Sequence, residues 1–112
     1  TFIAQLEEIG RRHDVLIVSF GHAGNGNIHV NLLGNAEDPD ERARMERCLG
    51  DVFSSVLGLN GTLSGEHGIG IAKRDYVGRE LSPEVMELMR GIKAVFDPAG
   101  ILNPGKGLPA PI

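Results

Sequence analysis

Two short motifs flanked by glycine contain residues with the chemistry of a metal site. The first motif covers residues 21–31 and reads Gly-His-Ala-Gly-Asn-Gly-Asn-Ile-His-Val-Asn, and the second covers residues 65–70 and reads Gly-Glu-His-Gly-Ile-Gly. Imidazole nitrogens and carboxylate oxygens are the ligands that hold divalent transition metals. Glycine lets the backbone form tight turns and come close to a ligand. We therefore interpret these two motifs as the candidate functional site.

The first motif predicts a hairpin that brings two histidines together. Asn25-Gly26 is typical of a two-residue turn between antiparallel strands, which we expect over residues 15–20 and 28–33. Such a turn pairs His22 with His29, and directly opposed Cβ atoms lie about 4.5–5.5 Å apart. The two imidazoles could then share one metal ion. The alternative is a pair of histidines that form hydrogen bonds in a polar cleft.

The second motif offers a third metal ligand and a base. Glu66 completes a set of two neutral imidazoles and one carboxylate, which leaves coordination positions for a substrate. The neighbouring His67 stays off the metal and, because imidazole titrates near neutral pH, suits general-base chemistry. Asn31 shares a strand face with His29, where its amide either binds an anion or faces solvent. The alternative for residues 65–70 is a turn with exposed polar side chains.

Other reactive residues have simpler interpretations. His13 stands in a charged stretch, so we expect a solvated side chain without a role. Cys48 lies beside an apolar helix face and is expected to be a buried structural cysteine. Lys73 and Arg74 either form a solvated surface or bind an anion.

Periodicity and breakers predict an α+β fold. Asp38-Pro39 has the form of a helix N-cap, and Ser82-Pro83 has the same form further along the chain. The other expected elements are a first helix ended by Gly10, a weak strand at 62–63, a short turn or helix over 71–77, a helix that stops at Asp97-Pro98, and an extended tail rich in Gly and Pro.

Composition restricts the class of protein. A chain of 112 residues with 41% hydrophobic and 23% charged residues fits one small globular domain. Its net charge of −4, without a basic cluster, argues against nucleic acid or an anionic membrane as partner. No apolar run is long enough to span a bilayer, and no signal peptide is visible. With a single cysteine, this predicts a cytoplasmic protein; for a full-length parent we also expect a location peripheral to the inner membrane.

Three motifs together resemble a known family. They are His-Ala-Gly-Asn-Gly-Asn-Ile-His, Gly-Glu-His-Gly-Ile-Gly and the ending Phe-Asp-Pro-Ala-Gly-Ile-Leu-Asn-Pro-Gly-Lys. In this order and spacing they resemble the C-terminal region of FAD-linked oxidases of the vanillyl-alcohol oxidase superfamily. The nearest branch contains D-lactate and D-2-hydroxyglutarate dehydrogenases and the glycolate oxidase subunit. The resemblance runs from about His13 to the end of the chain.

The resemblance implies a cap domain and a set of roles. Residues 1–97 would form part of a ferredoxin-like cap, an antiparallel sheet with helices on one face, and residues 98–112 a tail that packs on an FAD domain. The cap would bind a 2-hydroxy acid, and the hydride from its C2 would pass to flavin N5. The implied roles are metal ligands (zinc or manganese) for His22, His29 and Glu66, the base for His67, substrate binding for Asn31, and flavin proximity for Asn103.

From this we expect a C-terminal fragment of an FAD-dependent oxidase of D-2-hydroxy acids. Alone, the fragment would not bind FAD firmly and would not turn over substrate. It would also self-associate, because a missing neighbour leaves strand edges and an apolar face exposed. Two alternatives are a small metal-dependent hydrolase and a non-catalytic module that binds a metal or a protein.

Overall fold

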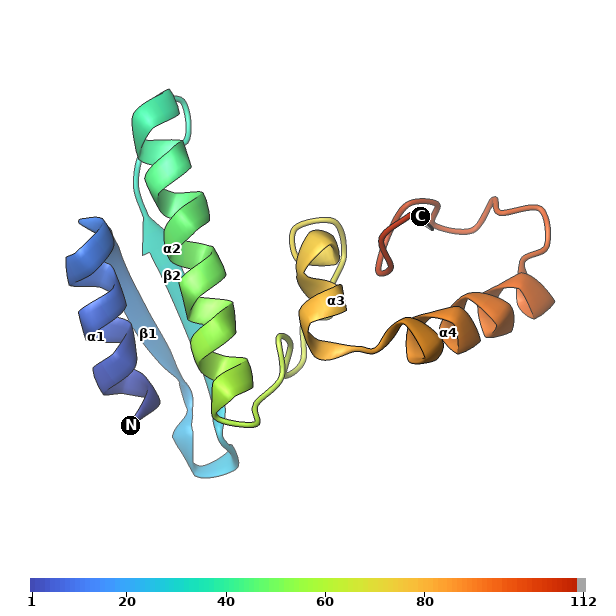
Figure 1. Cartoon of the computed structure of the whole chain (residues 1–112), viewed down its shortest axis with the longest axis horizontal. Helices are drawn as coiled ribbons and strands as arrows, with labels where there is room; N and C mark the ends of the chain where they lie inside the picture. The colour runs from blue at the N-terminus through green and yellow to red at the C-terminus, as the bar shows by residue number, and fades with distance from the viewer. Residues whose placement is uncertain (111–112) are drawn as a thin grey trace. The chain divides into compact units, whose positions relative to one another are not determined.

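The chain consists of two compact units, Thr1–Gly61 and Thr62–Ile112 (Figure 1). The computed structural model describes residues 1–110, apart from the side chains of His22 and Ala23. Helices and one antiparallel sheet confirm the α+β class. The elements of the first unit are α1 (Phe2–His13), β1 (Leu16–His22), the 3-10 turn η1 (Ala23–Asn25), β2 (Asn27–Leu33) and α2 (Pro39–Gly58); those of the second are η2 (Arg74–Tyr76), α3 (Val77–Glu80) and α4 (Pro83–Phe96).

In the first unit, α1 and α2 pack side by side on one face of the β1–β2 hairpin (Figure 1). Cys48 is fully buried there, as predicted, and burial raises the pKa of its thiol, so it stays protonated and unreactive. Burial of these side chains is the main force that holds the unit together. The core consists of Leu6, Ile9, Val15, Cys48 and Val52, with Phe2, Ile17, Val30, Leu32 and Met45 packed against it.

Gly10 lies inside α1 and does not end it, so that prediction was wrong. The helix continues to His13 and closes at Asp14, whose φ of 53° is left-handed. A Cβ built on Gly10 would lie 2.8 Å from the carbonyl oxygen of Val15 and 3.4 Å from the side chain of Ile17. Glycine is therefore present because α1 contacts the start of β1 closely, and the helix tolerates its backbone freedom.

The prediction that His13 is solvated was also wrong. Its Nε2 lies 2.5 Å from Oδ2 of Asp51 on α2, and only 16% of its side chain is exposed. Arg12 donates to the same carboxylate at 3.1 Å. The hydrogen bond with His13 lowers the pKa of Asp51, so the carboxylate stays ionised and links the two helices.

The hairpin has a different register from the predicted one. A 3-10 turn over Ala23–Asn25, followed by Gly26 at a φ of 70°, replaces the two-residue turn. His29 consequently lies opposite Phe20, and His22 lies opposite Asn27. The two histidines are thus not directly paired, because the longer loop shifts each strand partner by two residues.

The helix starts predicted from caps are confirmed. The side chain of Asp38 accepts from the amides of Asp40 and Glu41 at the start of α2, and Ser82 accepts from Val85 at the start of α4. The carboxylate of Glu41 accepts from the amide of Asn35, so it braces the preceding loop. Polar caps of this kind replace the hydrogen bonds that a first helical turn lacks.

The weak strand predicted at 62–63 is absent from the described part of the second unit. Leu63 is buried, but its amide donates to the carboxylate of Glu80 and its carbonyl accepts from the ammonium of Lys73. Side chains therefore take both backbone groups that a strand partner would bind. Burial lowers the pKa of Lys73.

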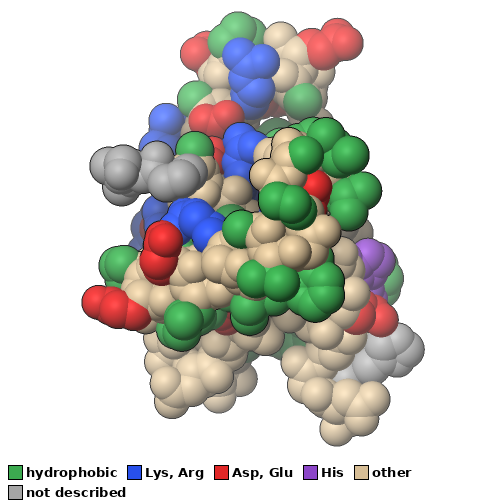
Figure 2. All heavy atoms as spheres, turned by 90° about the vertical axis from the view of Figure 1, so that its right-hand side faces the viewer, with side chains coloured by type: hydrophobic (Ala, Val, Ile, Leu, Met, Phe, Trp, Pro, Cys, Tyr) green, Lys and Arg blue, Asp and Glu red, His purple; other side chains and the backbone are tan. Residues whose placement is uncertain are grey.

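Helix α4 has an apolar face that is exposed. Val95 and Phe96 are 76% and 80% exposed, and hydrophobic side chains gather on the face that Figure 2 shows. In the described residues no helix is both long and apolar enough to cross a membrane. The exposed large side chains of α4 are Val85, Leu88, Met89, Ile92, Val95 and Phe96.

The close contact at Gly10 predicts a large cost for a single methyl group. Gly10→Ala should destabilise the first unit by about 1–3 kcal/mol, because the new Cβ must displace the Val15 carbonyl or the Ile17 side chain. Gly58→Ala is the matched control, since a Cβ there meets nothing within 4 Å. Urea unfolding followed by circular dichroism measures both. An equal or smaller loss for Gly10→Ala than for Gly58→Ala would contradict the packing explanation.

Candidate functional site

The six predicted site residues are divided between the two units. His22, His29 and Asn31 belong to the hairpin of the first unit, and Glu66, His67 and Asn103 belong to loops of the second. The side chain of His22 lies outside the described residues. The predicted division into a cap over residues 1–97 and a tail over residues 98–112 that packs on an FAD domain stays a prediction.

His29 is held on β2 by its aromatic neighbour across the ladder. The rings of His29 and Phe20 are stacked, with centroids 5.1 Å apart and planes 24° from parallel. Gly21 has a φ of 146°, and a Cβ there would lie 3.2 Å from Cδ2 of His29 and 2.7 Å from the carbonyl oxygen of Asn27. The half-buried imidazole therefore has a defined orientation.

Asn31 shares the open face of the sheet with His29. It is exposed and lies opposite Val18. Successive strand residues alternate between the two faces of the sheet. Since Val30 and Leu32 point to the core under α1 and α2, His29 and Asn31 point to the face that the helices leave uncovered. It combines two polar side chains with the exposed apolar residues Leu16, Val18, Phe20 and Leu33. Such a face can orient a polar ligand between apolar contacts.

Glu66 and His67 occupy an exposed turn built by glycine and serine. Oε1 of Glu66 and Nε2 of His67 lie 3.9 Å apart, and their side chains are 49% and 73% exposed. The hydroxyl of Ser64 accepts from the amide of Gly68 at 2.7 Å. Gly68 has a φ of 82°, which non-glycine residues resist. The turn thus presents a carboxylate and an imidazole together.

The tail is joined to this glycine turn within the second unit. The amide of Gly107 donates to the carbonyl of Gly70 at 2.8 Å. Arg74 donates to the carbonyl of Gly105 at 2.6 Å, and Arg90 donates to that of Pro109 at 2.9 Å. Arg74 therefore braces backbone, as Lys73 does at Leu63, a role that neither predicted alternative included.

The turn that carries Asn103 depends on the buried carboxylate of Asp97. Asp97 accepts from the amides of Ile101 and Leu102, both at 3.0 Å, and from the ammonium of Lys93 at 2.5 Å. The hydrogen bond from Lys93 is the first cause that lowers the pKa of Asp97, and the two amides add to it. Asn103 follows directly, exposed and with a left-handed φ of 49°.

Phe20 stacks on the candidate residue His29, and Ser64 and Asp97 accept hydrogen bonds in the turns that carry the other candidates; sequence reasoning missed all three. For Phe20 the missing information was the register. For Asp97 a signal was available: Asp before Pro-Ala-Gly suits a turn whose side chain accepts later amides. Asp97 was interpreted only as a helix end.

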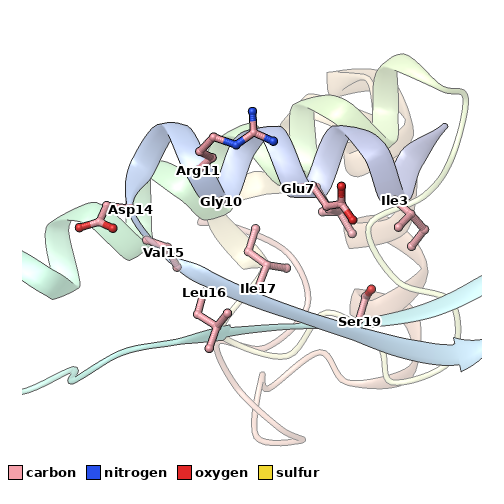
Figure 3. Close-up of a pocket in the computed structure, with 10 residues that line it drawn as sticks. Ile3, Glu7, Gly10, Arg11, Asp14, Val15, Leu16, Ile17 and Ser19 are labelled. Atoms are coloured by element: carbon pink, nitrogen blue, oxygen red, sulfur yellow. The ribbon is translucent and has the colours of Figure 1, made fainter.

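A groove of about 590 Å³ lies elsewhere in the first unit, between α1 and the outer edge of β1 (Figure 3). Glu7 and Arg11 of α1 and Ile17 and Ser19 of β1 are among the residues that line it. Of the predicted site residues whose side chains the structure describes, none does so.

Comparison with known proteins identifies the family. Residues 1–107 match the family described as FAD linked oxidases, C-terminal domain. The chain belongs to this family. The match covers nearly the whole sequence, so both units are included, and the resemblance inferred from the three motifs is confirmed.

The similar curated proteins are dehydrogenases or an oxidase subunit by name. The chain is 38% identical over 104 residues to glycolate oxidase subunit GlcD of Bacillus subtilis. It is 45% identical over 109 residues to D-2-hydroxyglutarate dehydrogenase of Stutzerimonas stutzeri, and 39% over 106 residues to D-lactate dehydrogenase of Anaerostipes hadrus. These alignments cover 93–94% of the chain but only 22–24% of each relative. The chain thus spans about a quarter of their length.

The Asp97 turn predicts a local pH dependence. Because the folded pKa lies below the ordinary value of about 3.9, the ionised carboxylate stabilises the turn above that pH. The stabilisation is lost as pH falls through the lower folded pKa. Amide hydrogen exchange at Ile101 and Leu102 should therefore accelerate in acid beyond its intrinsic rate.

Asp97→Asn should remove most of this protection at neutral pH, because an amide offers one oxygen where the carboxylate offers two. Asp75→Asn is the control, since Asp75 is 83% exposed and has only a 3.9 Å contact with Arg74. Equal exchange in the two variants would refute the role of Asp97.

Proposed function

We propose that the chain is the substrate- and metal-binding part of an FAD-dependent oxidoreductase that oxidises a D-2-hydroxy acid of the lactate, glycolate or 2-hydroxyglutarate type. The observation that carries this proposal is the family match over residues 1–107, together with the names of the relatives. The same match favours an oxidoreductase over the metal-dependent hydrolase and the non-catalytic module.

The metal ligands in this proposal are His22, His29 and Glu66. Two imidazoles and a carboxylate suit zinc or manganese and leave positions for substrate oxygens. His29 fits the role because its ring is held in one orientation by Phe20. Glu66 fits because its carboxylate is accessible on a glycine turn. The bound metal would polarise the hydroxyl and carboxylate oxygens of the substrate.

His67 is proposed as the base and Asn31 as a substrate contact. The imidazole of His67 is exposed, so it can accept the proton of the substrate hydroxyl and later release it to water. The amide of Asn31 can donate to a substrate carboxylate from the open face of the sheet. FAD, when bound, would accept the electron pair that leaves C2. Asn103 would lie near the flavin.

We expect the isolated chain neither to hold FAD firmly nor to turn over a hydroxy acid, because its family is the C-terminal domain of these enzymes. We also propose that the isolated chain self-associates. The apolar residues of α4 and of the open sheet face are exposed, and contact between copies would cover them. Sedimentation at rising concentration measures this, and a monomer throughout would refute it.

The metal site predicts a loss of bound ion in single variants. After loading with zinc and dialysis, the chain should retain about one ion, and His29→Ala and Glu66→Gln should retain far less, because two remaining ligands bind weakly. Elemental analysis measures the content. His13→Gln is the control for a lost histidine and Glu84→Gln for a lost carboxylate. Equal zinc in all variants would exclude the proposed ligand set.

The activity is tested in a chimera. The matched segment of the Stutzerimonas stutzeri relative is replaced with residues 1–107 of this chain, the range that matches the family, and oxidation of the three hydroxy acids is followed with a redox dye. The chimera should oxidise at least one of them. His67→Asn should lower kcat by about 10²–10⁴-fold, as loss of a general base does, and His13→Gln should not. A chimera that holds FAD and oxidises none of the three acids would contradict the proposal.

A further inference from the structure

A metal-binding histidine usually needs a partner that orients its ring. That partner is most often a carboxylate, carbonyl or water that accepts from the second ring nitrogen. In this chain His29 also has a neighbour of another kind, because the ring of Phe20 stacks against the imidazole. Gly21, the next residue, leaves the space beside the ring open, since a Cβ there would lie only 3.2 Å from Cδ2 of His29.

The stack against Phe20 is not made through a ring nitrogen. It uses the face of the imidazole, with 5.1 Å between centroids and 24° between planes. A stack of this kind is compatible with a bond from a ring nitrogen to a metal ion.

The stack of Phe20 and the open space at Gly21 come from adjacent residues on one strand, and both depend on the observed register. Phe20 lies directly opposite His29, and Gly21 lies opposite Ile28. The φ of 146° at Gly21 is available to glycine and strained for other residues. Any side chain there would also meet the carbonyl oxygen of Asn27 at 2.7 Å. Phe20 thus covers one face of the imidazole, and Gly21 leaves room for the ring in this position.

Burial in the core does not explain why an aromatic residue occupies position 20. Its side chain is 58% exposed and points away from the core, on the face that α1 and α2 leave open. An exposed aromatic ring gains little from burial, whereas a stack against a defined neighbour restricts that neighbour. Val18, two residues earlier on the same face, is also exposed and lies opposite Asn31.

We propose that Phe20 is a positioning residue for His29: it stacks on the imidazole and holds it ready to bind the cation. This deepens the proposed function and rests on the metal site in it. It predicts that Phe20→Leu, which keeps an apolar side chain but removes the ring, weakens Zn²⁺ binding about three- to tenfold. Phe20→Tyr, which keeps the ring, should restore the affinity of the unchanged chain.

The experiment is a calorimetric Zn²⁺ titration of the 112-residue chain, with Val18→Ala as the control on the same face. A second measurement needs no metal: the ring-proton NMR shifts of His29 should move downfield in Phe20→Leu, because the ring current of Phe20 is lost. Phe20→Tyr should leave these shifts nearly unchanged.

The outcomes separate this inference from the proposed function. If the unchanged chain binds no Zn²⁺ while the NMR shifts respond as expected, the metal site is wrong and the stack is real, and the positioning role falls with the site. If Zn²⁺ binds with the same affinity in Phe20→Leu as in Val18→Ala, the metal site stands and the positioning role is refuted. A tenfold loss that Phe20→Tyr does not reverse would also refute it.

Discussion

The register of one two-stranded ladder determines what the first unit can do. Because strand residues alternate between faces, the register sends Ile17, Val30 and Leu32 toward the helices and leaves Phe20 and His29 on the open face. The core and the candidate site are therefore opposite sides of the same hairpin. A shift of one residue would exchange them and expose the core. The apolar core consequently stabilises the position of the site residues without touching them.

This explains which part of the hairpin could be predicted from sequence. The predicted and observed registers differ by two residues at each partner, so every side chain keeps its face and only its opposite neighbour changes. Because apolar and polar residues alternate along a strand with a period of two, the pattern is the same for two registers that differ by two residues. The loop decides between them, and here Gly21 and Gly26 both take positive φ, which a sequence with several glycines does not reveal. The shared face of His29 and Asn31 was predictable, whereas the stack with Phe20 was not.

The second unit shows the same limit in another form. Caps at Ser82 and breakers at Asp97-Pro98 are local signals, and they predicted α4 correctly. The partners of a side chain are not local. Nothing in the sequence near Leu63 indicates that Glu80 and Lys73 bind its backbone in place of a strand. The apolar stripe of α4 is visible in the sequence, but periodicity shows amphipathicity and not what lies against the stripe.

The candidate site therefore combines two kinds of support. Its ligand types follow from the chemistry of imidazole and carboxylate, and these were visible in the two glycine motifs. Its proposed part in hydroxy-acid oxidation rests on the family match and on the names of the relatives. The structure adds that the two proposed ligands are presented differently: His29 stands on a strand with a stacked neighbour, and Glu66 stands on an exposed turn. A side chain on a strand keeps its geometry before a ligand binds, while a side chain on a turn can adjust to it.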